Sequence, residues 1–310
     1  MIWDVTNVSL TAGFRLFAVI GPTAAGKSAL AMALARRIGA EILSVDSMQV
    51  YRHMDIGTAK PSVLEQNEIP HHLIDVALPT ESFAVARFVE LADQVIEDVR
   101  SRQVPLIAVG GTPLYFKALF QGLFDGPAGD EDLRKNLSQI DPIELHSRLT
   151  KIDPETALRL HVNDTRRVIR ALEVFEITGS PISTLQTQWA GLPRHHATWL
   201  GVTAEKEILS RRINARVKQM IDAGWVDEVR QLHERFITLS PTAGEATGYA
   251  HLARHLRGEL SLADAIEEIK ILTRQLARKQ TKWFRRFENV TWYSSENDAE
   301  SVARSLALWS

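Results

Sequence analysis

Residues 21–28 read Gly21-Pro22-Thr23-Ala24-Ala25-Gly26-Lys27-Ser28. They follow an apolar run at 14–20 and open an Ala/Leu-rich segment that stops at Gly39. This order predicts a buried strand, a glycine-rich turn and a helix, and the eight residues fit the Walker A pattern in full. The backbone N–H groups of such a loop surround phosphate oxygens, and the helix N-terminus adds a favourable dipole. We expect Lys27 to face the terminal phosphates and the Ser28 hydroxyl to ligate Mg²⁺.

Strand and helix signals alternate on both sides of this loop. Short apolar runs at 41–45, 104–109 and 196–203 suit buried strands, and helical spacing marks 84–100, 205–223, 226–236 and 261–286. Apolar strands that alternate with helices predict an α/β fold, here a P-loop NTPase-like parallel sheet core flanked by helices.

The pattern changes at residues 123–189. Glycines and a proline within 126–129 mark a loop, and charged, amphipathic helical segments follow without a convincing strand. We therefore expect an inserted all-helical domain at 123–189. The α/β core with its C-terminal helices then comprises residues 14–122 and 190–310.

Composition excludes several classes of protein. The chain has 310 residues, 45% of them hydrophobic and 24% charged, and its net charge of -2 excludes a basic field over the whole surface. It contains no cysteine, which excludes disulfides, zinc–thiolate sites, iron–sulfur clusters and cysteine nucleophiles. No apolar run approaches the roughly 18 residues of a membrane span, and the first residues lack a secretory signal pattern. We expect a cytoplasmic monomer without a membrane partner.

Asp46 directly follows the apolar run 41–45. In a parallel sheet that end lies beside the phosphate loop, where ligands bind. Three roles stay open: a general base acting on an acceptor, a Mg²⁺ ligand through water, or a cap of the following turn. The run 104–109 ends in Gly110-Gly111-Thr112 without an acid, and no Asn-Lys-x-Asp motif for guanine is present. This pattern favours group transfer over nucleotide hydrolysis.

Basic residues gather in two further places. Arg166, Arg167 and Arg170 lie close together, and residues 274–286 hold six basic residues, no acid and an aromatic pair. Either cluster alone is equally well explained as a solvated helix face. Two such clusters in a chain of net charge -2 favour a groove for a phosphate backbone.

Arg212 and Arg216 are four residues apart on a predicted helix and therefore share a face. One of them would be placed to contact a pyrophosphate leaving group. The alternative is that both are ordinary solvated residues.

Several stretches together match one known family, namely residues 21–28, 44–61, 70–75, 109–112, 161–174, 248–249 and 273–286. On these stretches the chain resembles the bacterial tRNA dimethylallyltransferases, an IPP transferase family that prenylates the adenosine 3′ to the anticodon of tRNA. The resemblance spans roughly residues 14 to 295, and its segment 44–61 is far more specific than the Walker A pattern.

The resemblance implies that residues 21–28 hold the pyrophosphate of dimethylallyl diphosphate, with Mg²⁺ as cofactor. It implies catalytic roles for Asp46, which would accept a proton from the adenine N6 amine, for Thr112, and for Arg216, which would contact pyrophosphate. The tRNA partner would be bound through its anticodon stem-loop and flipped base. The residues expected to contact it are Asp46, Ser47, Met48, Gln49, Thr112, Arg134, Arg166, Arg167, Val168, Ile169, Arg170, Gly248, Tyr249, Arg278 and Lys282.

Two rival functions use the same loop. A P-loop kinase of a small metabolite or nucleoside would share the fold, bind ATP and need no basic RNA groove. An RNA-binding protein with a structural nucleotide site would need the basic RNA groove but no catalytic general base.

Overall fold

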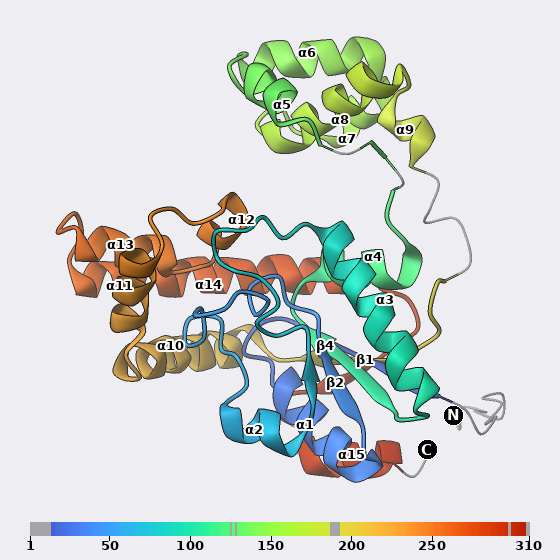
Figure 1. Ribbon diagram of the computed structural model, residues 1–310, viewed down its shortest axis with the longest axis vertical. Helices are drawn as coiled ribbons and strands as arrows, with labels where there is room; N and C mark the ends of the chain where they lie inside the picture. Colours follow the sequence, from blue (N-terminus) through green and yellow to red (C-terminus); the bar gives the residue numbers. More distant parts are fainter. Residues whose placement is uncertain (1–13, 125, 128, 187–192, 297–298, 308–310) are drawn as a thin grey trace. The chain divides into compact units, whose positions relative to one another are not determined.

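The computed structural model describes residues 14–124, 126–127, 129–186, 193–296 and 299–307. Within them, six strands form one sheet in the order β3-β2-β4-β1-β5-β6. Three of its central strands, β1, β2 and β4, are labelled in Figure 1. Every neighbouring pair runs parallel. The strands are β1 (Leu16–Ile20), β2 (Glu41–Ser44), β3 (His71–His72), β4 (Leu106–Gly110), β5 (Thr198–Thr203) and β6 (Val290–Ser294). The predicted parallel α/β sheet is thus confirmed.

Helices bury both faces of the central strands, and for this reason β1 and β2 are buried at every residue. On one face, α1 and α15 pack against each other and against alternate strand residues such as Val19 and Ile107. Elsewhere, aromatic side chains pack α4 against α3 and against α14. Phe88 of α3 stacks on Tyr115 of α4 with 4.3 Å between ring centroids, and Phe284 of α14 contacts Phe116 of α4 edge-on.

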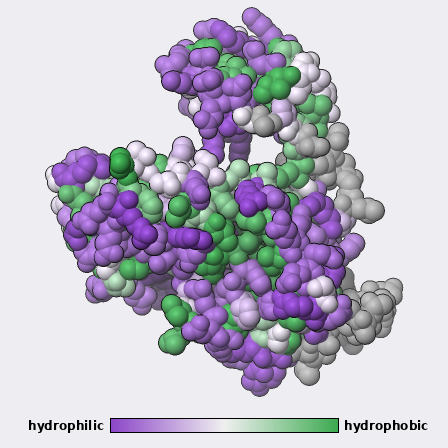
Figure 2. Space-filling model, in the orientation of Figure 1, coloured by the Kyte–Doolittle hydropathy of each residue, from purple (hydrophilic) through white to green (hydrophobic). Residues whose placement is uncertain are grey.

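The helices before the insertion are α1 (Lys27–Ile38), α2 (Val63–Glu68), α3 (Val85–Ser101) and α4 (Pro113–Gln121). Those after it are α10 (Lys206–Asp222), α11 (Trp225–Arg235), α12 (Pro241–Gly244), α13 (Tyr249–Leu256), α14 (Leu262–Phe284) and α15 (Ala299–Ala307). Among the helices in the described part of the chain, none is both long enough and apolar enough to cross a membrane. Figure 2 shows that hydrophilic residues cover most of the visible surface of the core, with hydrophobic residues gathered near the centre of that face.

The chain forms two compact units, one made of Met1–Leu119 with His196–Ser310 and the other of Phe120–His195. The second unit contains α5 (Glu131–Ser138), α6 (Pro142–Ile152), α7 (Pro154–Arg159), α8 (Thr165–Thr178) and α9 (Ile182–Leu185). Its described residues include helices and no strand, as the sequence predicts. The Arg194 amide donates to the Phe120 carbonyl at 2.8 Å, which ties the two ends of this unit together. The expected boundary near 189–190 lies outside the described residues.

One fully buried carboxylate organises the helical unit. Glu173, in α8, accepts hydrogen bonds from the Asp130 amide at 2.7 Å, from Arg134 and from Arg170. Burial alone would raise the pKa of Glu173, but the hydrogen bonds from Arg170, the Asp130 amide and Arg134 outweigh it. The pKa therefore lies below its usual value of 4.5. A lowered pKa stabilises the folded unit above the unfolded-state pKa, and this stability is lost as pH falls through the folded-state pKa.

We expect Glu173→Gln to destabilise the helical unit by about 3 kcal/mol at pH 7, the low end for breaking a buried ion pair, because both arginines reach water. The difference from wild type should shrink once pH falls below the usual glutamate pKa of 4.5. Pulse-labelling hydrogen exchange of α8 peptides across a urea series measures the free energy of unfolding of the helical unit in each variant. Glu144→Gln breaks the exposed pair with Arg148 in the same unit and should change stability by less than about 1 kcal/mol. Equal losses in the two variants would contradict the prediction.

Candidate active site

The phosphate loop links β1 to α1 in a conformation that its sequence permits. Gly21 and Gly26 have φ values of 147° and 99°, which side-chain-bearing residues rarely adopt. A Cβ at Gly21 would also stand 2.2 Å from the carbonyl oxygen of Val202 in β5. The Lys27 ammonium turns back over the loop and donates to the Pro22 carbonyl at 2.7 Å. The predicted strand, loop and helix are therefore all present in their predicted places.

Three predicted site residues, Lys27, Asp46 and Arg216, act on one another electrostatically. Burial lowers the pKa of Lys27 to about 7, the negative charge of Asp46 opposes that shift, and the positive charge of Arg216 adds to it. Burial likewise lowers the pKa of Arg216, again opposed by Asp46. One carboxylate from the turn after β2 and two cations from α1 and α10 thus lie close enough for their charges to interact beside the phosphate loop.

Asp46 caps the turn that follows β2. Its Oδ1 accepts hydrogen bonds from the Met48 amide at 2.8 Å and from the Gln49 amide at 3.4 Å. Among the described residues, Oδ2 accepts no hydrogen bond. The cap and the role of proton acceptor are therefore compatible, since they use different oxygens of one carboxylate.

The neighbouring predicted residues shape the same turn. The Thr112 hydroxyl oxygen accepts from the Ser47 amide at 3.1 Å, which joins the end of β4 to the Asp46 turn. The Gln49 side chain accepts from the Ser44 hydroxyl at 2.8 Å. Its amide donates to the carbonyls of Thr58 and Ala59. These bonds hold the turn in one conformation.

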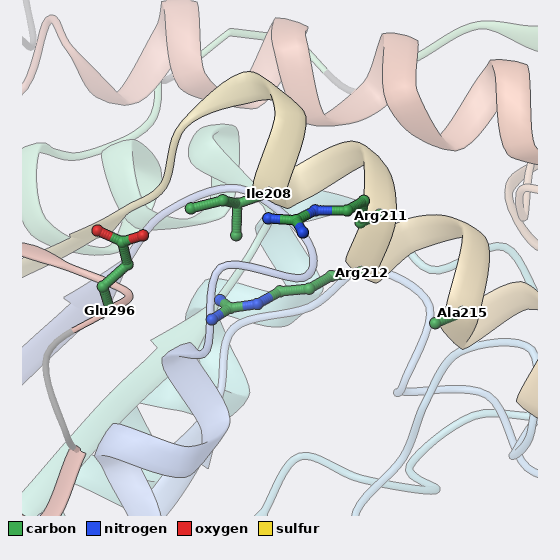
Figure 3. A pocket seen from close by; sticks show the side chains of 5 residues that line it. All are labelled: Ile208, Arg211, Arg212, Ala215 and Glu296. Carbon is green, nitrogen blue, oxygen red and sulfur yellow. The ribbon is translucent and has the colours of Figure 1, made fainter.

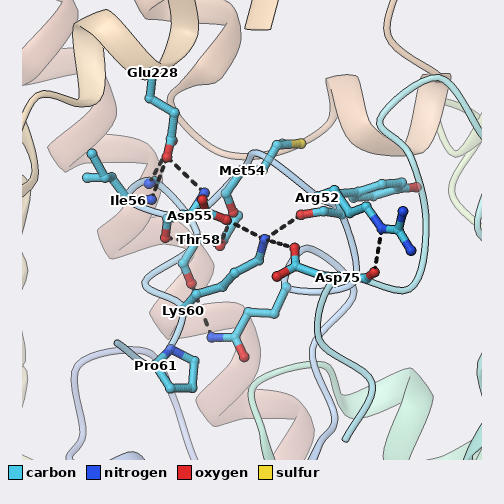
Figure 4. Close-up of polar contacts among 12 residues, drawn as sticks. Arg52, Met54, Asp55, Ile56, Thr58, Lys60, Pro61, Asp75 and Glu228 are labelled. Carbon is cyan, nitrogen blue, oxygen red and sulfur yellow. Dashed lines mark hydrogen bonds and ion pairs between the residues drawn. The ribbon is translucent and has the colours of Figure 1, made fainter. Parts of the chain in front are cut away.

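A polar network around a buried lysine, which sequence reasoning missed, holds the segment after the turn (Figure 4). The Lys60 side chain is only 4% exposed, and its ammonium donates to the Tyr51 carbonyl and to the carboxylates of Asp55 and Asp75. Glu228, in α11, accepts from three consecutive amides, those of residues 55–57. Glu228 lies in α11, whereas Lys60 lies in the segment that follows the Asp46 turn. The two are far apart in sequence, so no local pattern reveals the network.

Tyr249 belongs to this network and not to the surface. Its side chain is 1% exposed and its hydroxyl donates to Glu228 at 2.7 Å. The Tyr249 side chain therefore faces the protein interior, and the expected contact of Gly248 and Tyr249 with tRNA stays a prediction. Gly248 has a φ of 98°, and a Cβ there would collide with the indole of Trp225.

The predicted RNA-binding residues of the helical unit divide into three groups. Arg166 and Arg167 are exposed on α8. Val168 is completely buried and Ile169 packs against the same core, so these two side chains stabilise the helical unit, and the expected contact of this segment with tRNA stays a prediction. Arg134 and Arg170 both bind the buried Glu173.

The basic run after residue 273 forms the last part of α14. Arg278 and Lys282 are exposed, as expected of residues that contact RNA. Between them Gln280 points inward: the Thr23 amide donates to its Oε1 at 2.8 Å, and its Nε2 donates to the Gly111 carbonyl at 2.6 Å. Sequence reasoning missed Gln280, because its position within a basic run hides a contact with two distant loops.

A separate cavity of about 410 Å³ opens beside α10 (Figure 3). It is lined by Ile208, Arg211, Arg212, Ala215 and Glu296, of which only Arg212 was a candidate for contact with pyrophosphate. Arg212 donates to the Ser295 carbonyl at 3.1 Å. Of the two arginines that share this face of α10, Arg216 is therefore the one that acts on Lys27 and Asp46.

Comparison with known proteins gives the family. The model of the IPP transferase family matches residues 49–287. A tRNA dimethylallyltransferase of Geobacter metallireducens is 46% identical over 298 residues, which cover 94% of this chain and 96% of the relative. A tRNA dimethylallyltransferase of Pelotomaculum thermopropionicum is 43% identical over a region that covers 94% of this chain and 95% of the relative.

Solved structures agree with this result. A tRNA isopentenylpyrophosphate transferase of Bacillus halodurans has a TM-score of 0.71 and 38% identity, with 95% of each chain covered. A eukaryotic dimethylallyltransferase acting on tRNA has a TM-score of 0.81 and 29% identity, covering 95% of this chain and 78% of the other. By sequence and by fold, the chain belongs to the IPP transferase family.

Proposed function

We propose that this enzyme transfers a dimethylallyl group from dimethylallyl diphosphate to N6 of adenosine 37, 3′ to the anticodon, in tRNA. The observation that carries the proposal is that the phosphate loop with Lys27 and the Asp46 turn leave the sheet at the same edge, where the charges of Lys27, Arg216 and Asp46 act on one another. A diphosphate leaving group needs the cations, and an amine acceptor needs the carboxylate. The family membership supports the same reaction. We propose further that the enzyme acts as a monomer in the cytoplasm.

The chemistry follows from these charges. The N6 lone pair attacks the first carbon of the dimethylallyl group, and the bond from that carbon to the diphosphate oxygen breaks. The electron pair leaves with pyrophosphate, whose growing charge Lys27, Arg216 and the loop amides stabilise. The N6 proton passes to Asp46, a step worth about 10²–10⁴-fold in rate, because an exocyclic amine is a weak nucleophile.

Mg²⁺ is proposed as the cofactor, held by the Ser28 hydroxyl and by oxygens of the donor. Within the described residues no group of three or more His, Cys, Asp or Glu side chains is arranged to hold a metal ion. That fits Mg²⁺, which keeps several waters and is bound mainly through substrate phosphates. When bound, it neutralises charge on the diphosphate.

The acceptor base must leave its stack to reach Asp46, at a cost of a few kcal/mol. We propose that Ser47, Met48 and Gln49 line the site that receives the flipped adenine. Arg278 and Lys282 on the core, and separately Arg166 and Arg167 on the helical unit, would contact backbone phosphates of the anticodon stem-loop. Phosphate contacts position the RNA without reading its sequence.

The donor test separates this function from a kinase. We expect dimethylallyl diphosphate to bind much more tightly than ATP, and a competition titration by calorimetry measures both. Micromolar binding of ATP with no binding of the allyl diphosphate would overturn the transferase and favour a P-loop kinase.

Asp46→Asn tests the base. Asparagine keeps an Oδ1 that caps the turn but cannot take a proton, so single-turnover transfer should slow by about 100-fold or more, while donor and tRNA affinities hold. Raising Mg²⁺ should not restore the rate. Asp141→Asn is the matched control, because Asp141 Oδ1 caps α6 through the amide two residues on, at 2.9 Å. Near-wild-type transfer by Asp46→Asn would refute the role, and rescue by Mg²⁺ would reassign Asp46 to the metal.

Replacing Arg278 and Lys282 by glutamine tests the RNA contact on α14. Each lost phosphate contact should weaken tRNA binding and flatten the log–log salt dependence by up to about one unit, with donor affinity unchanged. Arg87→Gln removes an exposed arginine that is paired with Glu90 on α3, and it should leave the slope as it is. An unaltered slope in the double variant would mean that these side chains are only solvated.

A further inference from the structure

A single buried side chain connects the phosphate loop to the end of β4. Gln280 is 8% exposed, between the buried residues Ala277 and Phe284 along the inner side of α14. Its carbonyl oxygen receives the Thr23 N–H and its amide nitrogen donates to the Gly111 carbonyl. A primary amide is one of few neutral groups that both accept and donate from one rigid plane. Gln280 therefore fixes two backbones at once.

The connection continues to the catalytic carboxylate. Gly111 is followed by Thr112, whose hydroxyl oxygen accepts the Ser47 N–H at 3.1 Å. Ser47 is adjacent to Asp46 in the turn. Hydrogen bonds, together with the peptide links from Gly111 to Thr112 and from Ser47 to Asp46, therefore connect the loop assigned to the donor with the turn assigned to the acceptor.

From this path we propose that Gln280 is a positioning residue, which sets the place of the phosphate loop relative to the Asp46 turn. The proposal rests on the proposed function, in which these two segments hold the donor and the acceptor. Transfer requires the allylic carbon and N6 to be aligned, and a misplacement of about 1 Å can cost about 100-fold in rate. Gln280 bonds to loop backbone and to strand-end backbone, so its loss should affect alignment more than affinity.

Gln280→Met keeps the length of the side chain and removes both hydrogen bonds. We expect single-turnover transfer at saturating donor and tRNA to slow by about 10- to 100-fold. Dissociation constants for dimethylallyl diphosphate and tRNA, measured separately by calorimetry and filter binding, should stay within about threefold. Gln275→Met, an exposed position on the same helix, is the matched control and should transfer at the wild-type rate.

Gly111→Ala tests the same contact from the other side. A Cβ at Gly111 would stand 2.7 Å from the Gln280 Nε2, so the amide must move. We expect the same slow transfer with unchanged affinities. Because both changes break one contact, the double variant should be no more than about threefold slower than the slower single variant.

The outcomes are distinct. If wild type transfers the group and Gln280→Met does so equally fast, or loses rate only through weaker donor binding, the positioning role is overturned while the proposed function stands. The positioning role is also overturned if the rate losses of the two single variants multiply in the double variant. If Gln280→Met does not fold, Gly111→Ala alone decides by its rate and affinities. If wild type transfers nothing, the proposed function itself is wrong.

Discussion

Everything at the site depends on three parallel strands that end side by side. In the ladder Ile20 of β1 pairs with Gly110 of β4, and Ser44 of β2 pairs with Val109. The phosphate loop, the Asp46 turn and the segment with Thr112 therefore leave the sheet at one edge, where parallel strands place ligand sites. Backbone hydrogen bonds and apolar packing impose this proximity, so the charged groups do not have to attract one another to meet.

The same proximity concentrates charge. The charges of two partly desolvated cations, Lys27 and Arg216, act on one carboxylate, Asp46, and burial makes the charged states of the cations harder to maintain. An anionic diphosphate placed among them would offset that cost. Such a site selects its ligand by charge balance as much as by shape. The rigid Lys60–Glu228 network, by contrast, contains its own acceptors and holds the neighbouring segment independently of any ligand.

The central sheet could be predicted because β1, β2 and β4 are buried on both faces and are therefore apolar runs. Strand β6 was missed, since it is a partly exposed edge strand without such a run, and β3 has only two residues. The loop, Asp46 and Arg216 were recognisable from local pattern and resemblance. Gln280 was not, because its partners lie more than 150 residues away in sequence. Val168 and Tyr249 show that a matching position does not reveal which way a side chain points.

The hydrogen bond between the Arg194 amide and the Phe120 carbonyl has an evolutionary consequence. Because its two ends touch, the helical unit connects α4 to β5 as a short turn would. Its length therefore adds little entropic cost to the folding of the rest of the chain. With its own apolar core and its own buried carboxylate at Glu173, such a unit can be gained, lost or exchanged by recombination at one point in the gene. The helical unit and the sheet are therefore free to diverge in sequence at different rates.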